Sequence, residues 1–499
     1  MRAMRSFLVT CLLVTPGLAQ DSITVEGSWW SSFGPMVLSQ DGDRVQGSYG
    51  FDERALEGEL DGQELRLAYG DGGEVVFQLW PDGEHMSGPW TSGERSGRWG
   101  AYRQQPRQAE PRPGEITTGQ SESGLRYHLR VPEDYDPDRS YTAVVILHGS
   151  NMSARDYVAT FPAAWPGLAE RYLILGFDGE QMNGFARVGS PSYNYSYVNF
   201  GGPGVGPPFA HRQSPALVAQ ALQQLQGELP VERWILGGHS QGGFLTYALA
   251  MFYPELLAGV FPMSCNLLVQ CEPSSFDDRE LRARQRRLAF APIHGIGDPV
   301  VPFSGGEYCY GALVDGGFPL SRFFTHERAG HMFALLPVEE AITWIDRLTA
   351  ERPEDVLSVA ERGLEANRWR DVGAALWAGR ELGFDAGQRE RMDRARAALQ
   401  RAAAVPLGEL EPKLMANRDG SWVDEFLAFR EDFAFAPAAA EVMAAYAALR
   451  RVHQGPADEL FRKQRQTTDE TERDRLRRAI VEDYYASSWY PLVKDWLSE

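Results

Sequence analysis

A short glycine-rich stretch around Ser240 has the residue types that a serine nucleophile needs. The apolar run Trp234-Ile-Leu236 predicts a buried strand, and the residues from Phe244 to Phe252 predict a helix. Between them stands Gly238-His-Ser-Gln-Gly242, a Gly-x-Ser-x-Gly pattern. Such a turn holds the serine in a strained backbone conformation, with its hydroxyl exposed at the top of a sheet. We expect glycine on both sides because a Cβ there would clash with the neighbouring strand or helix.

A serine hydroxyl also needs a base within hydrogen-bond reach. His331 stands in Ala329-Gly-His-Met, between the last predicted strand and the last predicted helix. His326 is the competing base, but it lies nearer the strand end and no glycine precedes it. We therefore expect His331 to take the proton of Ser240.

The base in turn needs an acid that orients it. Asp298 lies in His294-Gly-Ile-Gly-Asp298, directly after an apolar strand. The order Ser240, Asp298, His331, each in a loop that follows a strand, is the order of one serine-hydrolase architecture. We expect His294 to pack against the Asp298 loop or to order it, rather than to act as the base.

The negative oxygen that develops during acyl transfer needs hydrogen-bond donors, and losing one donor typically costs about 3 kcal/mol. We expect one to be the backbone N–H of Gln241, at the start of the helix after the nucleophile. The other is expected in His148-Gly-Ser150, after an early strand, and we assign it to the N–H of Ser150. This chemistry requires neither a metal nor an organic cofactor.

These residues must be positioned by a sheet, and residues 119–350 have the pattern for one. Apolar runs alternate with helical patterns, which predicts an α/β fold with a doubly wound, mainly parallel sheet. In open α/β sheets the site forms at the carboxyl ends of the strands. The expected strands lie at residues 125–131, 141–147, 173–177, 233–237, 258–262, 288–293 and 322–325.

The irregular segment 183–213 is rich in Gly, Pro and aromatic residues. Long loops of this kind are often functional. We expect this one to lie near Ser240 and to line an acyl or aromatic pocket; an ordered surface loop that packs its own tyrosines is the alternative. The candidate substrate-binding residues are Tyr193, Tyr195, Tyr197 and Phe200.

Two further regions flank this domain. Residues 22–104 repeat an Asp-Gly turn followed by alternating apolar residues at a spacing near 20 residues, which predicts a small antiparallel β-meander closed as a barrel or sandwich. Its tryptophans are expected to form the core, although stacking on sugar rings is the alternative. Residues 105–118 are a polar, proline-bearing linker. Residues 352–499 predict an α-helical domain with breaks near Pro406, Gly420, Pro437 and Gly455.

The composition limits the partners and the compartment. The chain has 499 residues and a formal charge of −19, which argues against nucleic-acid binding. Residues 1–19 have the basic start, short apolar run and small residues of a signal peptide, so we expect cleavage after Ala19 and export to a periplasm or outside the cell. No later stretch predicts a membrane span. The flanking regions are the candidates for binding a glycan or a protein partner.

Three cysteines remain after the expected cleavage: Cys265, Cys271 and Cys309. Export permits a disulfide. Pairing of Cys265 with Cys271, pairing of Cys271 with Cys309, and three buried thiols all stay open.

Residues 120–350 resemble the α/β-hydrolase superfamily, and within it the secreted polyhydroxybutyrate depolymerases and the feruloyl or acetylxylan esterases. The matching segments are Tyr127-His-Leu-Arg-Val-Pro132, Val144-Val-Ile-Leu-His-Gly149, Gly238-His-Ser-Gln-Gly242, Gly297-Asp-Pro-Val-Val-Pro302 and Gly330-His331. Two departures leave the substrate open: Ser150 stands where the depolymerase-like group often has Cys, and residues 183–213 lack a familiar pattern.

The sequence thus predicts an exported serine hydrolase that cleaves a small-molecule or polymer-linked carboxylic ester through an acyl-enzyme. Two alternatives stay open: a serine peptidase of the same fold, and a binding protein whose hydrolase domain is vestigial.

Overall fold

The computed structural model describes residues 24–104 apart from 51, 71 and 82, together with 109–185, 191–195, 214–266, 279–416, 420–487 and 489–498. The chain divides into two compact units, residues 1–103 and 104–499. No described helix has the length and apolar character needed to cross a membrane.

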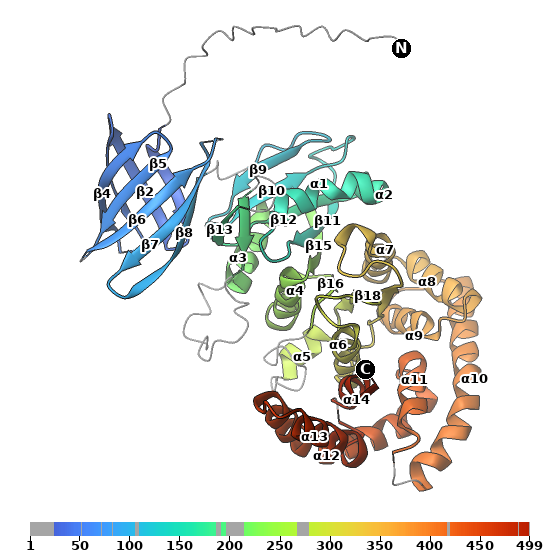
Figure 1. Ribbon diagram of the computed structural model, residues 1–499. Helices are drawn as coiled ribbons and strands as arrows, with labels where there is room; N and C mark the ends of the chain where they lie inside the picture. The colour runs from blue at the N-terminus through green and yellow to red at the C-terminus, as the bar shows by residue number, and fades with distance from the viewer. Residues whose placement is uncertain are drawn as a thin grey trace, which may run out of the picture. The chain divides into compact units, whose positions relative to one another are not determined.

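The first unit is a closed barrel in which each strand pairs antiparallel with the next and β8 closes on β1 (Figure 1). The predicted Asp-Gly turns lie between paired strands, where Gly42, Gly62 and Gly83 have positive φ angles that glycine adopts without strain. The strands are β1 (Gly27–Ser31), β2 (Gly34–Asp41), β3 (Arg44–Tyr49), β4 (Arg54–Asp61), β5 (Glu64–Tyr69), β6 (Gly73–Leu79), β7 (His85–Ser92) and β8 (Arg95–Arg103).

The barrel interior is filled by side chains. Trp29, Trp80 and Trp99 are buried, as expected for a core, whereas Trp30 and Trp90 are half-buried. The glycan or protein partner of this unit stays a prediction.

The second unit contains the predicted doubly wound sheet, which the structure confirms. The strand order is β19-β18-β16-β15-β11-β12-β10-β9, with β17 beside β16. The pairs from β12 to β19 are parallel, and β10 and β9 add an antiparallel edge. The bounds are β9 (Ile116–Gln120), β10 (Arg126–Arg130), β11 (Tyr141–Leu147), β12 (Leu173–Phe177), β15 (Val231–His239), β16 (Gly259–Met263), β17 (Ala289–Phe290), β18 (Ile293–Gly295) and β19 (Phe324–His326). A separate hairpin pairs β13 (Gln181–Phe185) with β14 (Pro191–Asn194).

Helices cover both faces of this sheet, because alternate residues of its buried strands point to opposite sides. In β11, Val144 and Ile146 join one core with α1, α2 and α7, while Val145 and Leu147 join the other with α3, α4 and α6. The helices are α1 (Ala154–Ala164), α2 (Pro166–Ala169), α3 (Ser214–Glu228), α4 (Gln241–Phe252), η2 (Pro254–Leu256), α5 (Arg279–Gln285), α6 (Phe303–Asp315), η5 (Phe333–Leu335) and α7 (Val338–Thr349).

The remaining helices form an arc that belongs to the same compact unit (Figure 1). Most of their apolar side chains, from Val356 to Tyr446, continue the core on the α7 side of the sheet. A separate, smaller cluster contains Ala457, Phe461, Ile480 and Val493. The arc returns to the sheet region because α14 packs against α6. The bounds are α8 (Pro353–Glu365), α9 (Trp369–Ala378), η6 (Gly379–Glu381), α10 (Ala386–Ala416), α11 (Val423–Phe433), η7 (Pro437–Ala439), α12 (Ala440–Gln466), α13 (Glu470–Asp483) and α14 (Tyr490–Ser498).

Two expected helix breaks are wrong. Pro406 lies inside α10, and Gly455 lies inside α12 together with Pro456. A proline in a helix interior removes one backbone hydrogen bond. Buried residues on both sides of Pro406, such as Ala403 and Leu410, keep α10 packed against the core, which offsets that local cost.

Two of the cysteines that could form disulfides are described. Cys265 and Cys309 are both buried. Cys271 lies outside the described residues, so its pairing stays a prediction.

Candidate active site

Ser240 stands on a sharp turn between β15 and α4. Its φ is 53° and its ψ is −116°, a backbone conformation that is strained for any residue except glycine. A Cβ on Gly238 would lie 2.2 Å from the carbonyl oxygen of Gly242, and one on Gly242 would lie 2.3 Å from that of Leu147. The structure therefore confirms that both flanking positions require glycine. The N–H of Ser240 donates to the carbonyl of Met263 in β16 at 2.9 Å, which fixes the turn to the sheet.

His331 and Asp298 come from two other loops and meet directly. His331 Nδ1 lies 2.7 Å from Asp298 Oδ2. The other carboxylate oxygen, Oδ1, accepts the N–H groups of Val300 at 2.8 Å and Val301 at 2.9 Å. Burial raises the pKa of Asp298, but these N–H groups and His331 outweigh burial, so its pKa lies below the ordinary value. An ionised Asp298 stabilises the His331 tautomer that carries hydrogen on Nδ1, which leaves Nε2 free to accept a proton.

The two competing histidines have other surroundings. His294 is buried, and its Nε2 donates to the carbonyl of Val301 at 3.0 Å, so it ties together the ends of the loop that carries Asp298. His326 Nδ1 accepts the N–H of Arg328 at 3.2 Å. His326 does not line the cavity that contains Ser240.

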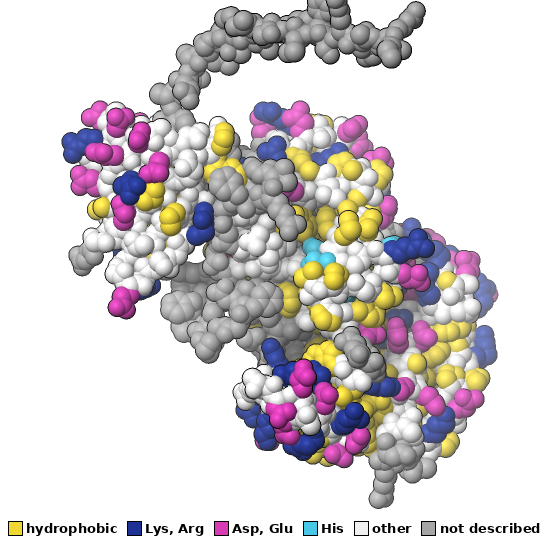
Figure 2. Space-filling model, in the orientation of Figure 1, with side chains coloured by type: hydrophobic (Ala, Val, Ile, Leu, Met, Phe, Trp, Pro, Cys, Tyr) yellow, Lys and Arg dark blue, Asp and Glu magenta, His cyan; other side chains and the backbone are white. Residues whose placement is uncertain are grey.

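A cavity of about 800 Å³ is lined by both Ser240 and His331. Most of its wall is apolar or aromatic, and it includes exposed hydrophobic side chains: Val300 is 64% exposed and Met332 is 61% exposed. Figure 2 shows hydrophobic side chains gathered beside a histidine on the face drawn. The wall residues that frame Ser240 and His331 are Met152, Tyr157, Phe244, Val300, Met332 and Phe333.

The two residues expected to supply oxyanion donors both lie close to Ser240. Ser150 lines the cavity, and Gln241 is the first residue of α4. Neither backbone N–H donates to another described residue, so both are available to an incoming oxygen. The side chain of Gln241 has a role that the sequence did not predict: its Oε1 accepts the backbone N–H of Tyr195 at 3.1 Å.

The loop with Ser150 is held by His148. Its Nδ1 donates to the carbonyl of Gly149 at 2.7 Å, and its Nε2 accepts the N–H of Gly179 at 3.0 Å. These two roles belong to a neutral imidazole. Burial lowers the pKa of His148, which agrees with the neutral form. The loop is therefore fixed from within the protein before any substrate arrives.

Tyr193 and Tyr195 were expected to line the substrate pocket, and the structure places them elsewhere. They are 0% and 1% exposed, and neither lines the cavity. The Tyr195 hydroxyl donates to the carbonyl of Phe177 at 2.8 Å and accepts the N–H of His148 at 3.1 Å. The backbone of Tyr193 pairs with Asn151 at 3.1 Å and with Met152 at 2.9 Å, so both tyrosines hold the Ser150 loop. Tyr197 and Phe200 lie outside the described residues, so their role stays a prediction.

The aromatic and apolar wall of the cavity was missed from the sequence. Phe333 lies two residues after His331, and Tyr157 lies one helical turn into α1. A signal for Phe333 was present, because Met332 to Leu335 is an apolar run directly after His331. Tyr157 carried no signal, since an aromatic residue at helical spacing is normally core.

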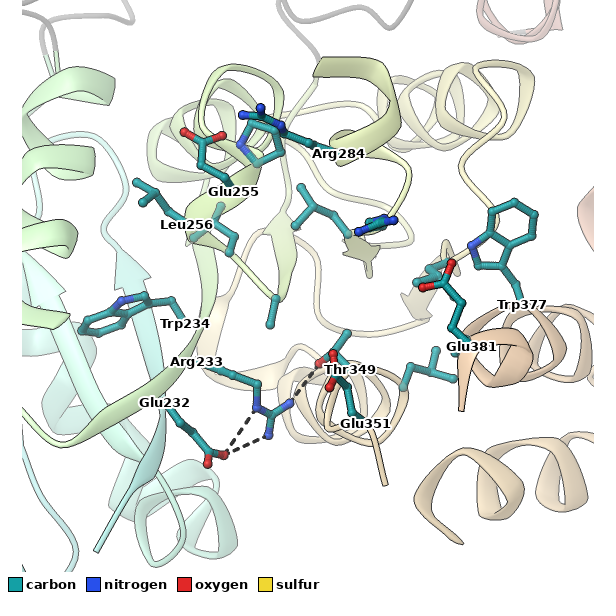
Figure 3. A pocket seen from close by; sticks show the side chains of 18 of the residues that line it. Glu232, Arg233, Trp234, Glu255, Leu256, Arg284, Thr349, Glu351, Trp377 and Glu381 are labelled. Atoms are coloured by element: carbon teal, nitrogen blue, oxygen red, sulfur yellow. Dashed lines mark hydrogen bonds and ion pairs between the residues drawn. The ribbon is translucent and has the colours of Figure 1, made fainter. Parts of the chain in front are cut away.

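A second cavity of about 820 Å³ lies at the opposite, amino-terminal edge of the strands. Its described lining contains no Ser, Cys or His. Figure 3 shows the Arg233 guanidinium directed at Glu232 and Thr349, and Arg233 also pairs with Asp346 at 2.7 Å. Its charged residues carry both signs, and its described lining offers no histidine that could activate a nucleophile: Glu232, Arg233, Glu255, Arg284, Arg287, Glu351, Arg380 and Glu381.

Comparisons with known proteins agree with this architecture. Residues 210–317 match the phospholipase/carboxylesterase family. The chain is 25% identical over 188 residues to "Probable feruloyl esterase C" of Aspergillus niger, which covers 37% of the chain and 58% of that protein. It is 27% identical over 198 residues to feruloyl esterase C of Emericella nidulans, covering 38% and 62%. The chain thus spans about three fifths of the length of these relatives.

Solved structures give lower similarity. A Bacillus cereus carboxylesterase is 16% identical, with a TM-score of 0.31, covering 45% of this chain and 94% of that one. A ferulic acid esterase is 14% identical, with a TM-score of 0.34, covering 44% and 90%. From its sheet, its helices and its matches in sequence, the second unit contains an α/β-hydrolase domain that resembles the esterases of that superfamily, feruloyl esterases among them.

Proposed function

We propose that the protein is a serine hydrolase that cleaves carboxylic esters. The observation that carries this proposal is one cavity that is lined by both Ser240 and His331. Nδ1 of that histidine lies 2.7 Å from Oδ2 of Asp298. A strained serine turn, an oriented base and a buried carboxylate together form the arrangement that nucleophilic acyl transfer needs.

The reaction follows from these positions. Ser240 attacks the ester carbonyl while His331 Nε2 takes its proton, and Asp298 stabilises the imidazolium that forms. The N–H groups of Ser150 and Gln241 donate to the oxygen that becomes negative. His331 then returns the proton to the leaving alcohol, which leaves an acyl group on Ser240. Water attacks that acyl group by the same route and frees the carboxylic acid and the serine.

The cavity wall supports an ester with an apolar or aromatic acyl group as the substrate. Phe244, Phe333 and Met332 offer apolar contact close to Ser240. The relatives named as feruloyl esterases make hydroxycinnamoyl esters the first group to test, both as small molecules and linked to a polymer.

A substrate panel tests the proposal. It includes p-nitrophenyl acetate, p-nitrophenyl butyrate, methyl ferulate, an acetylated sugar, a polyester and an aminoacyl amide. We expect ester hydrolysis by the wild type, and none above background by Ser240→Ala. A fluorophosphonate probe should label the wild type at Ser240 only. Hydrolysis of the amide without any ester would instead favour a peptidase, and an unlabelled Ser240 would favour a vestigial domain.

We also propose that the protein is exported. The support is the leader-like pattern of residues 1–19, which lie outside the described residues. Mass spectrometry of the protein from the medium or periplasm should find an N-terminus at Gln20. An intact Met1 on cytoplasmic protein would contradict export.

A further inference from the structure

Tyr157 is a buried residue of α1 whose hydroxyl lies between two catalytic loops. The hydroxyl accepts the N–H of Gly149 at 3.2 Å and lies 2.8 Å from Nδ1 of His239. A tyrosine hydroxyl has one hydrogen, and Gly149 is a donor, so that hydrogen goes to Nδ1. Burial raises the pKa of Tyr157, so the hydroxyl keeps its hydrogen.

His239, the residue before Ser240, receives this hydrogen bond as a neutral ring. It is 6% exposed, and burial, followed by the charge of His331, lowers the pKa of His239 to about 3. Because Nδ1 accepts, the hydrogen of the neutral ring sits on Nε2. This Nε2–H makes a hydrogen bond to no described group. The two histidine rings are 4.6 Å apart between centroids.

The backbone at Gly149 is packed tightly against this pair. A Cβ on Gly149 would lie 3.1 Å from the Tyr157 hydroxyl, 3.3 Å from His239 Nδ1 and 3.5 Å from Ser240 Cβ. Three loops therefore meet at the buried side chains of Tyr157 and His239. They are the loop of Ser150, the turn of Ser240 and the loop of His331.

We propose that Tyr157 and His239 are a positioning pair that links the three catalytic loops. Tyr157 fixes the peptide before Ser150, and His239 extends this contact across the serine turn to the ring of His331, on which it packs. Neither residue exchanges a proton with the substrate. The inference rests on the proposed ester hydrolysis for its kinetic test, whereas the contacts themselves can be tested without activity.

Tyr157→Phe is the central variant because it removes the hydroxyl and keeps the ring, which packs on Phe333 at 4.5 Å between centroids. We expect kcat on p-nitrophenyl acetate to fall about 10-fold, with KM within about twofold, a loss typical of one hydrogen bond in the active site. Tyr172→Phe is the matched control: it removes a buried hydroxyl that donates to Asp346 at 3.0 Å, outside the cavity of Ser240. The control should keep kcat while losing similar thermal stability.

Variants of His239 distinguish positioning from packing. His239→Asn keeps an acceptor close to the place of Nδ1, whereas His239→Leu does not. We expect the asparagine variant to retain more of kcat than the leucine variant. Tyr157→Phe combined with His239→Leu should lose little more than His239→Leu alone, because the two residues act in one chain. Additive losses, or an unchanged kcat in Tyr157→Phe, would overturn the proposal.

Hydrogen exchange gives a readout that does not need activity. In Tyr157→Phe the amide of Gly149 loses its acceptor, so a peptide spanning residues 148–153 should exchange faster than in the wild type and in Tyr172→Phe. Unchanged exchange there would overturn the positioning pair. If the wild type hydrolyses no ester but this peptide still responds, the proposed function fails while the link between the loops stands.

Discussion

The two edges of the same parallel sheet carry cavities of nearly equal size and opposite character. The cavity at the carboxyl edge, about 800 Å³, holds a strained serine, a carboxylate–histidine pair and apolar walls. The cavity at the amino edge, about 820 Å³, holds Arg233 in an ion pair with Asp346, with charges of both signs around it. The two cavities therefore differ in the chemistry of their lining residues and not in size.

The difference follows from the direction of the strands. In every parallel strand the chain leaves the sheet at the carboxyl edge. Loops that are distant in sequence therefore meet there, as those of Ser240, Asp298 and His331 do. Buried neutral histidines also gather at this edge, since His148, His239 and His294 all hold its loops. At the amino edge the charges instead pair with each other.

The strongest test of the comparison is Asp298→Asn. The asparagine amide preserves the shape of the loop but carries no charge to stabilise an imidazolium. We therefore expect kcat on an ester to fall about 10³–10⁴-fold. Esterase assays at saturating substrate measure this, with circular dichroism as the control for folding. A loss below about 10-fold would mean that the carboxyl edge does not depend on this pair.

As the pH falls, we expect the structure at the carboxyl edge of the sheet to lose stability at a higher pH than the structure at the amino edge. Burial lowers the pKa of His148, His239 and His294. As the pH falls, these histidines therefore become protonated in the unfolded chain while they are still neutral in the folded protein. This stability is complete above the ordinary histidine pKa near 6.5 and is lost as pH falls towards the folded values, with that of His239 about 3. Each such histidine contributes a slope of about 1.4 kcal/mol per pH unit in that window.

Urea unfolding between pH 7 and pH 4 measures that slope, and hydrogen exchange locates it. We expect faster exchange at pH 5 in peptides that contain residues 148–153 and 239–243. Peptides near Arg233 should change less. A free energy of unfolding that is constant from pH 7 to pH 4 would contradict the neutral histidines.

Arg233→Ala tests the amino edge. It leaves the Asp346 carboxylate, whose side chain is 15% exposed, without its 2.7 Å partner. The Tyr172 hydroxyl still donates to Asp346 at 3.0 Å, so the carboxylate keeps one partner. We expect the free energy of unfolding to drop by about 1–3 kcal/mol, the usual contribution of a hydrogen bond to a charged group. The kcat should stay within about twofold of wild type. A large loss of kcat at unchanged stability would mean that the two edges are coupled.

The smallest effect is expected at the rim of the active-site cavity. Met332→Gln keeps the side-chain length and places an amide where apolar contact is expected. We expect KM for methyl ferulate or a butyrate ester to rise about two- to fivefold, with little change for an acetate ester, because only the larger acyl group reaches the rim. Equal effects on both esters would argue against acyl contact at Met332.

Much of the second unit could be predicted because its signals are local. The strands expected at 141–147 and 173–177 are β11 and β12 with the same bounds. Continuous apolar runs between turn residues specify such elements directly. The glycines around Ser240 were equally informative, because their role depends on atoms only a few residues or one strand away.

The parts that failed depend on tertiary packing. Tyr193 and Tyr195 looked like loop aromatics near a site, yet long-range hydrogen bonds to the His148 loop bury them. Pro406 looked like a helix break, yet the core on both sides keeps α10 continuous. Tyr157 gave no signal at all, since its importance comes from a 2.8 Å contact with a residue 82 positions away in sequence.

The return of the helical arc to α6 has a consequence for biosynthesis. Trp489 stacks on Tyr308 of α6 at 5.0 Å between ring centroids, and Arg430 and Arg450 both pair with Asp315 at the end of that helix. Because the chain is synthesised from its N-terminus, about 180 residues follow α6, and most of them must be made before these contacts with α6 can form. At ordinary elongation rates this takes on the order of 10 seconds. During that interval the outer surface of α6, the helix that follows the Asp298 loop, lacks its cover in the nascent chain. Closure of the arc is therefore among the last steps of maturation, and it completes the packing around the helix that follows the Asp298 loop.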